Sequence, residues 1–301
     1  MQQTSLANVE PMIDRCYLEV TNICNLDCVF CPKNERTKRR LTTEQFDLLT
    51  EKLRGEVKFL YFHLMGEPML HPQLPQFIRM AREKGFLPVL TTNGTLLSRG
   101  QEVIDAHPYK IQISLHSQEG NGIAGLASYV AEVMIFAIES ARQGVVVVLR
   151  LWNQGGYNNS NDQLLDLMSQ HVPQPWTERY DGFRLCQNLY LEYDRMFEWP
   201  EPDTARPQVD EAFCAALKKQ IGVLVDGSLV PCCLDHEGCV TLGNLFTQSL
   251  DEILHSPRAQ RLLDGFSHHK AVEPLCQHCE GAGVKTSFRG KNGVAILNVK
   301  N

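Results

Sequence analysis

The feature that most constrains the fold is a regular alternation of short apolar runs with amphipathic segments across the first half of the chain. The apolar runs have the length of buried strands, and the segments between them carry apolar residues at helical spacing. This alternation predicts an α/β architecture of parallel strands joined by right-handed helical crossovers, with the strands ending at one common rim. We expect strands at 16–21, 57–64, 87–92, 110–116 and 145–152, and helices at 42–54, 74–84, 99–106, 126–142 and 161–170.

Composition places the chain among ordinary globular proteins of about two domains. It has 301 residues, of which 43% are hydrophobic and 21% charged, and this is enough length to bury a core. The N-terminus has no basic segment followed by an apolar one, and the longest apolar run, 145–149, is too short to span a bilayer. We therefore expect no membrane segment. The formal net charge of -6 disfavours extensive nucleic-acid binding, which needs clustered Lys and Arg.

Eleven cysteines in a chain without a secretory signal predict metal or redox chemistry in the cytoplasm rather than a disulfide framework. Three of them, Cys24, Cys28 and Cys31, follow the first predicted strand with the spacing Cys-x3-Cys-x2-Cys. A structural zinc site and an electron-transfer 4Fe-4S cluster each take four protein ligands, so three thiolates leave one position for another molecule. The same spacing would place three small apolar side chains on one helix face, but Asp27 and Pro32 favour a loop.

Polar and turn-forming residues follow each of the next four predicted strands. Ligands bind at the carboxyl ends of strands in such sheets and barrels, so we expect these residues to converge on one site. Taken singly, Asn93-Gly94 would be a turn, Glu67-Pro68 a helix start and Arg150 a surface cation. The candidates are Met65, Gly66, Glu67 and Pro68, then Thr92, Asn93 and Gly94, then Ser114 and His116, and finally Arg150 and Asn153.

Residues 33–40, KNERTKRR, place five basic side chains beside one acid directly after the cysteine loop. They could hold an anionic substrate near the three thiols. A solvated loop is the more frequent outcome for such a run of charges.

A second group of cysteines lies in the last third of the chain. Between 171 and 213 the periodicity fades into Pro-rich and aromatic sequence that is typical of a domain connection. Residues 221–233 then predict a β-hairpin around an Asp-Gly turn, followed by a helix capped by Ser249. For the four thiols alone, zinc and an iron-sulfur cluster are equally compatible, and the three-thiol loop favours iron. The ligand candidates are Cys214, Cys232, Cys276 and Cys279.

The loop CNLDCVFC, together with the segment MGEP at 65–68, resembles the radical S-adenosylmethionine enzymes. The resemblance implies a partial (β/α)6 TIM-like barrel whose cysteine loop holds a 4Fe-4S cluster, with the fourth iron left for the amino and carboxylate groups of S-adenosylmethionine. It implies that segment 65–68 receives the methionine amino group, although Met65 stands where a first glycine is usual. It also implies that Phe30 packs beside the adenine, that Ser114 faces the ribose or methionine and that Arg150 meets the carboxylate. The cofactor-binding residues expected are Phe30, Gly66, Glu67, Pro68, Thr92, Asn93, Ser114 and Arg150.

The segment from Cys214 to Cys279 is similar to the SPASM and twitch auxiliary-cluster domains of such enzymes. No cysteine follows Cys279, so the resemblance implies the shorter twitch form with one auxiliary 4Fe-4S cluster. Its spacing is most similar to that of aminocyclitol dehydrogenases of antibiotic biosynthesis. The expected domains are an N-terminal extension over 1–13, the barrel over 14–175, a connection over 176–213, a small α+β auxiliary domain over 214–281 and a C-terminal tail over 282–301.

The family cleaves S-adenosylmethionine reductively and uses the 5'-deoxyadenosyl radical to abstract hydrogen from a C-H bond, with electrons from a flavodoxin- or ferredoxin-type reductant. Three functions fit the resemblance: an oxidoreductase that oxidises or crosslinks its substrate with the auxiliary cluster as electron acceptor, an epimerase with a cysteine hydrogen donor, and a noncatalytic two-cluster electron carrier. The auxiliary cluster favours oxidation. The absence of a further recognition domain before the barrel favours a small molecule or a short peptide as substrate. The thiols outside both sets are Cys16, Cys186, Cys233 and Cys239, of which Cys233 and Cys186 are the catalytic candidates.

Overall fold

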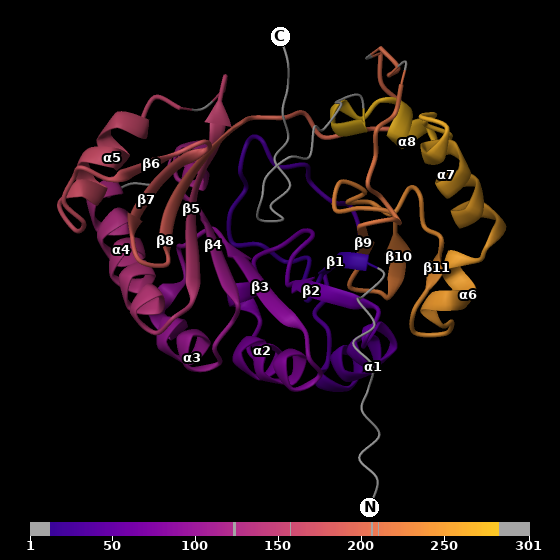
Figure 1. The fold of residues 1–301 in the computed structure, drawn as a ribbon, viewed down its shortest axis with the longest axis horizontal. Coiled ribbons are helices and arrows are strands. Elements are labelled where there is room, and N and C mark those ends of the chain that lie inside the picture. Colours follow the sequence, from indigo (N-terminus) through magenta and orange to yellow (C-terminus); the bar gives the residue numbers. More distant parts are fainter. Residues whose placement is uncertain (1–12, 123–124, 157, 206, 210, 283–301) are drawn as a thin grey trace, which may run out of the picture.

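The computed structural model describes residues 13–122, 125–156, 158–205, 207–209 and 211–282. Its centre is an eleven-stranded sheet in the order β11-β10-β9-β1-β2-β3-β4-β5-β8-β7-β6, curved so that helices α1 to α4 cover its convex face (Figure 1). The strands are β1 (Ile13–Leu18), β2 (Val57–Tyr61), β3 (Leu87–Thr92), β4 (Lys110–Ser114), β5 (Val146–Gln154), β6 (Thr177–Arg179), β7 (Gly182–Cys186), β8 (Leu189–Arg195), β9 (Gln220–Val223), β10 (Ser228–Val230) and β11 (Gly243–Asn244). The helices are α1 (Thr43–Leu53), α2 (Leu74–Glu83), α3 (Gly100–Asp105), α4 (Leu126–Arg142), α5 (Asn161–Ser169), α6 (Leu250–Leu254), α7 (Pro257–Ser267) and α8 (Pro274–Gln277).

The predicted partial barrel is confirmed. Strands β1 to β5 and β8 are parallel and pair in chain order, and helix α4 has the predicted bounds. Strand β1 lies a few residues earlier than predicted, because the chain leaves the ladder after Leu18 and the carboxylate of Glu19 takes other partners.

The predicted connection over 176–213 is wrong for residues 177–195. These residues form β6, β7 and β8, and β8 pairs parallel with β5 as the sixth barrel strand. Strand β6 is exposed throughout and β7 is largely unburied, so neither needs the apolar run that marks a buried strand. The barrel therefore extends past the boundary predicted at residue 175.

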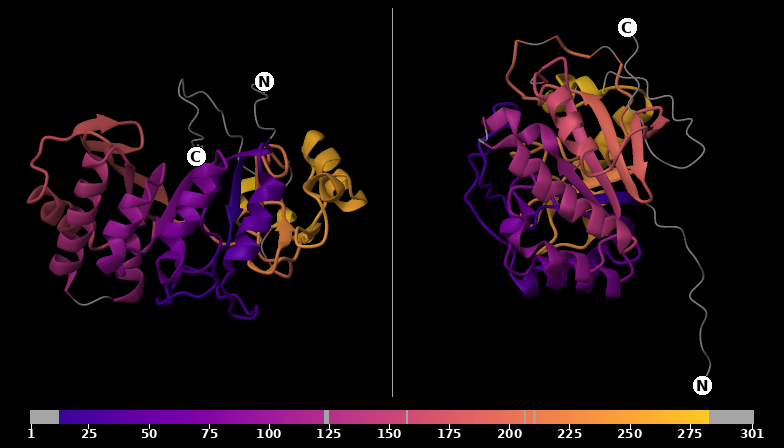
Figure 2. Two further views of the ribbon diagram at one scale, coloured as in Figure 1. Left: turned by 90° about the horizontal axis from the view of Figure 1, so that it is seen from below. Right: turned by 90° about the vertical axis from the view of Figure 1, so that its left-hand side faces the viewer.

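The predicted hairpin is confirmed as β9 and β10, which turn at Asp226-Gly227 with Gly227 at φ 84°. Strand β9 also pairs parallel with β1, residue Ile221 beside Cys16, so the C-terminal region extends the barrel sheet. Helix α6 begins at the predicted cap, Ser249, in a capping box with Glu252. Helices α6 and α7 lie at one end of the molecule and the β6–β7 edge at the other (Figure 2).

A layer of aromatic rings packs against the carboxyl end of β2, where the candidate site begins. Phe46 of α1 stacks on Phe77 of α2 with ring centroids 4.1 Å apart, and it meets Phe62 edge-on at 5.6 Å. All three side chains are fully buried. Because Phe62 directly follows β2, this packing fixes the carboxyl end of that strand against two helices.

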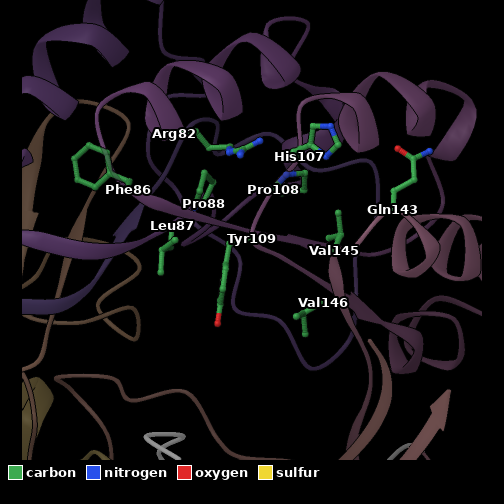
Figure 3. Close-up of a pocket in the computed structure, with 11 residues that line it drawn as sticks. Arg82, Phe86, Leu87, Pro88, His107, Pro108, Tyr109, Gln143, Val145 and Val146 are labelled. Carbon is green, nitrogen blue, oxygen red and sulfur yellow. The ribbon is translucent and has the colours of Figure 1, made fainter. Parts of the chain in front are cut away.

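A hollow of about 280 Å³ opens beside the amino ends of β3, β4 and β5 (Figure 3). Ligands of parallel β/α sheets bind at the opposite, carboxyl end, so this hollow is not the expected place of the reaction.

Among the described residues, no helix is both long enough and apolar enough to cross a membrane. The predicted N-terminal extension up to Met12 and the predicted tail beyond Ala282 lie outside the described residues.

Candidate active site

The three-thiol loop follows β1 and lies at the carboxyl rim of the barrel. The amide of Cys31 donates to the carbonyl of Cys28 over 3.1 Å, which tightens the second half of the loop. Burial raises the pKa of Cys31 to about 12, and the negative charges of Cys28 and Cys24 add to the effect. The three sulfurs are thus close enough to influence one another, and metal binding there must displace protons.

The connection between β4 and α4 packs against this loop. The Val29 amide donates to the Gly120 carbonyl over 3.2 Å, and a Cβ added to Gly120 would lie 2.4 Å from the ring of Phe30. The Phe30 ring also lies 5.1 Å from that of His116. Glycine at position 120 therefore allows Phe30 to lie at the rim, where an adenine-contacting residue is expected.

The segment at 65–68 is bound tightly to the cysteine loop. Gly66 has φ 81°, and a Cβ there would lie 2.3 Å from the carbonyl oxygen of Thr21. The amide of Glu67 donates to Ile23 over 2.8 Å. One Glu67 carboxylate oxygen accepts from the amide of Met69 and the other from the amide of Asn93, at 2.9 and 2.7 Å. The carboxylate of Glu67 therefore links the ends of β2 and β3, and burial raises its pKa to about 7.

Gly66→Ala is expected to destabilise the protein by roughly 1–3 kcal/mol or more, because the added methyl meets a backbone oxygen in a left-handed conformation. Gly55→Ala is the matched control. Gly55 has the same φ of 81° with nothing within 4 Å of the added Cβ, so it isolates the cost of the close approach. Urea unfolding of the two variants measures the difference, and equal losses of stability would show that the contact with Thr21 is unimportant.

Asn93, at the end of β3, connects that strand to the cysteine loop. Its side-chain amide donates to Asn25 over 3.0 Å, and Asn25 in turn donates to Thr95 over 2.8 Å. The hydroxyl of Thr92 accepts from the Gly94 amide over 3.2 Å and shapes the same turn. The rims of β1, β2 and β3 are thus held together by side-chain amides and one carboxylate.

The barrel interior is lined with aromatic and charged groups. Tyr17 lies 4.9 Å from Tyr61 and 5.5 Å from His63, measured between ring centroids. Arg150 of β5, beside Ser114 of β4 in the sheet register, is 8% exposed. Burial lowers the pKa of His63 to about 3, and the positive charge of Arg150 contributes. A neutral imidazole and a buried guanidinium therefore share the interior.

Two polar atoms in this interior lack a hydrogen-bond partner within the described part of the chain. They are Nε of Arg150 and Nδ1 of His63, both buried. The Arg150 guanidinium lies 4.0 Å from the Trp152 ring centroid. Buried polar groups are normally paired, so these atoms are candidates for contact with a bound molecule.

The structure also brings His116 to this rim, where its ring nitrogen lies 3.2 Å from the Arg150 carbonyl oxygen. Asn153 instead bonds Asn161 at the start of α5.

The four C-terminal thiols also converge. Burial raises the pKa of Cys214 to about 11, with the charge of Cys279 contributing. Burial likewise raises the pKa of Cys276, to which Cys214 and Cys279 add. Burial also raises the pKa of Cys232, and the charges of Cys233, Cys214 and Cys279 add to the effect.

The donor chemistry of both sets, thiols alone, fits iron-sulfur clusters. In the described part of the chain, no three His, Cys, Asp or Glu side chains lie close enough to hold a single metal ion. Thiols around a four-iron cluster are spread more widely than those around one ion. The residues that would hold the two clusters are Cys24, Cys28 and Cys31, and Cys214, Cys232, Cys276 and Cys279.

Most of the basic segment after the cysteine loop is exposed, as expected for a solvated loop, but Arg36 is largely buried and paired. The Arg36 guanidinium bonds both carboxylate oxygens of Glu19, at 2.8 and 2.6 Å, and its Nε donates to the His236 carbonyl over 2.8 Å. Glu19 is fully buried and also accepts from the amides of Met65 and Val225, at 3.2 and 2.9 Å. This ion pair joins β1, the cysteine loop, the rim of β2 and the hairpin region.

The structure separates the two predicted catalytic cysteines. Cys233 packs against the apolar cluster that contains Tyr17 and Met65, and burial raises the pKa of its thiol to about 11, a rise that the Tyr17 hydroxyl and the charge of Arg15 oppose. Cys186 is exposed on β7, where the nearby charges are those of Arg184 and Arg142. Only Cys233 therefore remains a candidate for contact with substrate.

Several residues of this site were not predicted from the sequence. Glu19 could have been suspected, because a carboxylate inside an apolar strand needs a buried partner. Arg36 and Tyr17 carry no such signal, since their roles depend on contacts with residues distant in the chain.

A three-thiol loop at the rim of a partial β/α barrel, with a four-thiol set beside it, defines a class of iron-sulfur proteins with one cluster open to a ligand. Residues 18–117 match the Radical SAM superfamily, and residues 214–280 match SPASM, an iron-sulfur cluster-binding domain. The chain therefore contains a radical SAM domain and a SPASM domain. The cofactors of these domains are 4Fe-4S clusters and S-adenosylmethionine.

Known sequences and structures illustrate the similarity. The chain is 36% identical over 87 residues to the tungsten-containing aldehyde ferredoxin oxidoreductase cofactor-modifying protein of Pyrococcus furiosus, a match that covers 27% of the chain and only 24% of that protein. It is 23% identical over 289 residues to the S-adenosyl-L-methionine-dependent 2-deoxy-scyllo-inosamine dehydrogenase of Niallia circulans, covering 89% of the chain and 93% of that enzyme. The crystal structure of BtrN in complex with AdoMet and 2-DOIA superimposes with a TM-score of 0.55 at 17% identity, covering 92% of this chain and 97% of that one.

Proposed function

We propose that this protein is a radical S-adenosylmethionine dehydrogenase that oxidises a C-H bond of a small polar molecule. The similarity over most of both chains to a scyllo-inosamine dehydrogenase supports the reaction class. A peptide substrate is the alternative. When bound, the cofactors supply a radical derived from S-adenosylmethionine, which removes a hydrogen atom from substrate, and a second cluster able to accept the electron left behind. An external flavodoxin- or ferredoxin-type protein would provide the electron that starts each cycle.

The observation that carries the proposal is a small apolar cluster that both cysteine regions contact. It consists of Tyr17, Leu64, Met65, Leu224 and Val230, and both Cys31 and Cys233 pack against it. Since Cys233 adjoins the predicted ligand Cys232, the same cluster contacts the three-thiol loop and the neighbour of a predicted auxiliary ligand. Apolar packing between these two regions would serve the exit of an electron from a substrate in the barrel.

The remaining roles follow from the chain's own groups. The segment at 65–68 and Ser114 would orient S-adenosylmethionine at the rim, with Phe30 beside its adenine. Arg150 has a buried, unpartnered Nε that can donate to a carboxylate. Tyr17, Tyr61 and His63 would contact substrate and, being largely aromatic, would exclude water from the reacting carbon.

Alanine at Cys276 or Cys279 is expected to stop product formation while cleavage of S-adenosylmethionine continues. These thiols are predicted to hold the electron acceptor, and they lie outside the three-thiol loop. Liquid chromatography of 5'-deoxyadenosine and of product measures both steps. Cys186→Ala, on the exposed edge strand, is the matched control and should retain both. Full product from the Cys276 variant would rule out the auxiliary site as the electron acceptor.

The position of Cys233 beside Tyr17 favours one second candidate, an epimerase in which that thiol returns a hydrogen to the opposite face of the carbon. Turnover in deuterium oxide separates the two reactions. A dehydrogenase leaves no solvent deuterium on the reacting carbon, whereas an epimerase retains one because a thiol exchanges with water. If the wild-type product retained deuterium and the Cys233→Ala product did not, the protein would be an epimerase and not a dehydrogenase.

A further inference from the structure

One cysteine of the three-thiol loop receives a side-chain hydrogen bond from outside the loop. Asn121, in the short 3-10 turn Glu119–Asn121 between β4 and α4, lies 93 positions from Cys28 in the sequence. Its side-chain Nδ2 donates to the Cys28 sulfur over 3.0 Å. In contrast, Cys24 accepts from the backbone amide of Leu26 within its own loop.

The neighbours of Asn121 determine which way its amide faces. Its Oδ1 accepts from the backbone amide of Asp27 over 2.9 Å, and Nδ2 donates to the carbonyl of Ser117 over 2.7 Å. A backbone N-H is only a donor and a carbonyl only an acceptor, so exchanging the oxygen and nitrogen would lose both bonds. The group directed at the sulfur is therefore the N-H donor.

The same contacts hold this donor in place before any cluster is bound. Asn121 is tied at Oδ1 to the cysteine loop and at Nδ2 to its own turn. The adjacent Gly120 carbonyl accepts from the Val29 amide over 3.2 Å. The β4–α4 connection and the cysteine loop are consequently locked on both sides of the sulfur, and little conformational entropy remains to be lost when the sulfur takes on charge.

We propose that Asn121 is a positioning residue that sets the reduction potential of the cluster held by the three-thiol loop. Hydrogen bonds to cluster sulfurs are one of the means by which a protein tunes this potential. Reduction adds negative charge that the thiolate sulfurs share, so a fixed donor stabilises the reduced form more than the oxidised form. This donor makes the cluster easier to reduce and leaves its fourth iron free, because it acts on a thiolate that is already a ligand.

This inference rests on the assignment of a cluster to the loop, and it does not depend on the reaction or on the substrate. Its test is a redox titration, followed by electron paramagnetic resonance, of the full chain purified without oxygen. The relevant signal is the one that changes when S-adenosylmethionine is added. The auxiliary cluster in the same sample serves as an internal reference.

Asn121→Asp keeps the oxygen that accepts from the Asp27 amide and replaces the donor by a negatively charged oxygen, whereas Asn121→Leu removes both groups. We expect the potential of the S-adenosylmethionine-responsive cluster to shift to more negative values in both variants, and further in Asn121→Asp. A shift of about 59 mV would mean a tenfold smaller one-electron equilibrium constant for reduction. The auxiliary cluster should keep its potential.

Asn25→Ala is the matched control, because the Asn25 side chain supports the same loop through Asn93 and Thr95, and the substitution keeps the Asn25 backbone amide, which lies near the Cys24 sulfur. It should leave both potentials unchanged. A potential that is unchanged in Asn121→Asp, or unchanged in Asn121→Leu with its iron retained, would overturn the proposal. Loss of iron from the loop in both variants would overturn it too, since that loss would indicate support of the loop alone. Equal shifts in Asn25→Ala would overturn it as well. If the wild-type protein formed no oxidised product, the proposed function would be contradicted. The measured reduction potentials would still test the role of Asn121.

Discussion

Simultaneous replacement of Cys24, Cys28 and Cys31 by alanine is expected to remove about half of the iron and sulfide and all cleavage of S-adenosylmethionine, because one of two four-iron clusters loses every protein ligand. The four C-terminal thiols lie outside the altered loop, with Cys214 before the β9–β10 hairpin, Cys232 after it, Cys276 in α8 and Cys279 just beyond α8, so their cluster should persist. Iron and sulfide analysis with electron paramagnetic resonance measures the outcome.

The control for this experiment replaces Cys186 and Cys239, two exposed thiols outside both sets, and it should retain all the iron. Iron content unchanged by the triple replacement would contradict the assignment of the loop. A wild-type protein with one cluster and one zinc would instead contradict the auxiliary assignment.

Arg36→Met is expected to destabilise the protein by about 3–5 kcal/mol, because it leaves the carboxylate of Glu19 buried without its cation. The side chains of Arg36 and Glu19 are 13% and 0% exposed, so solvent screens the pair little. Since Glu19 also accepts from Met65 and Val225, weaker cluster retention should accompany the loss. Urea unfolding measures the stability.

Arg39→Met provides the comparison, since Arg39 lies in the same segment with an exposed side chain. Its effect should fall within about 0.5 kcal/mol, as for ordinary surface changes. Adding Glu19→Gln to the Arg36 variant should recover part of the lost stability by removing the unpaired charge. If Arg36→Met were as mild as Arg39→Met, the ion pair would not be what connects the cysteine loop to the hairpin.

The barrel was predictable where burial forces a pattern on the sequence. Helix α4 was predicted with its observed bounds because one of its faces is buried against the sheet, and the buried runs of β3 and β5 are apolar. Strands β6 and β7 were missed because they form an exposed edge of the sheet, held by backbone ladders that any residue can make. The joining of β9 to β1 was missed for a similar reason, since pairing between distant segments leaves no local signal.

The cysteine sets were predictable because spacing in the sequence nearly determines spacing in space within one loop. The segment at 65–68 was recognisable because Gly66 meets a backbone oxygen that excludes other residues. The partners of Arg36 and Asn121 lie many residues away in the chain, so ordinary side chains acquired their roles only through the fold. Asn153 lies at the predicted rim of the barrel, but its side chain donates a hydrogen bond to Asn161 of α5.

Formation of 5'-deoxyadenosine tests the central claim most directly. The protein, purified without oxygen and reduced with dithionite in the presence of S-adenosylmethionine, is expected to produce 5'-deoxyadenosine, and the Cys24, Cys28 and Cys31 variant should produce none. If the wild-type protein carried both clusters in full and formed no 5'-deoxyadenosine, it would be an electron carrier and not a radical enzyme.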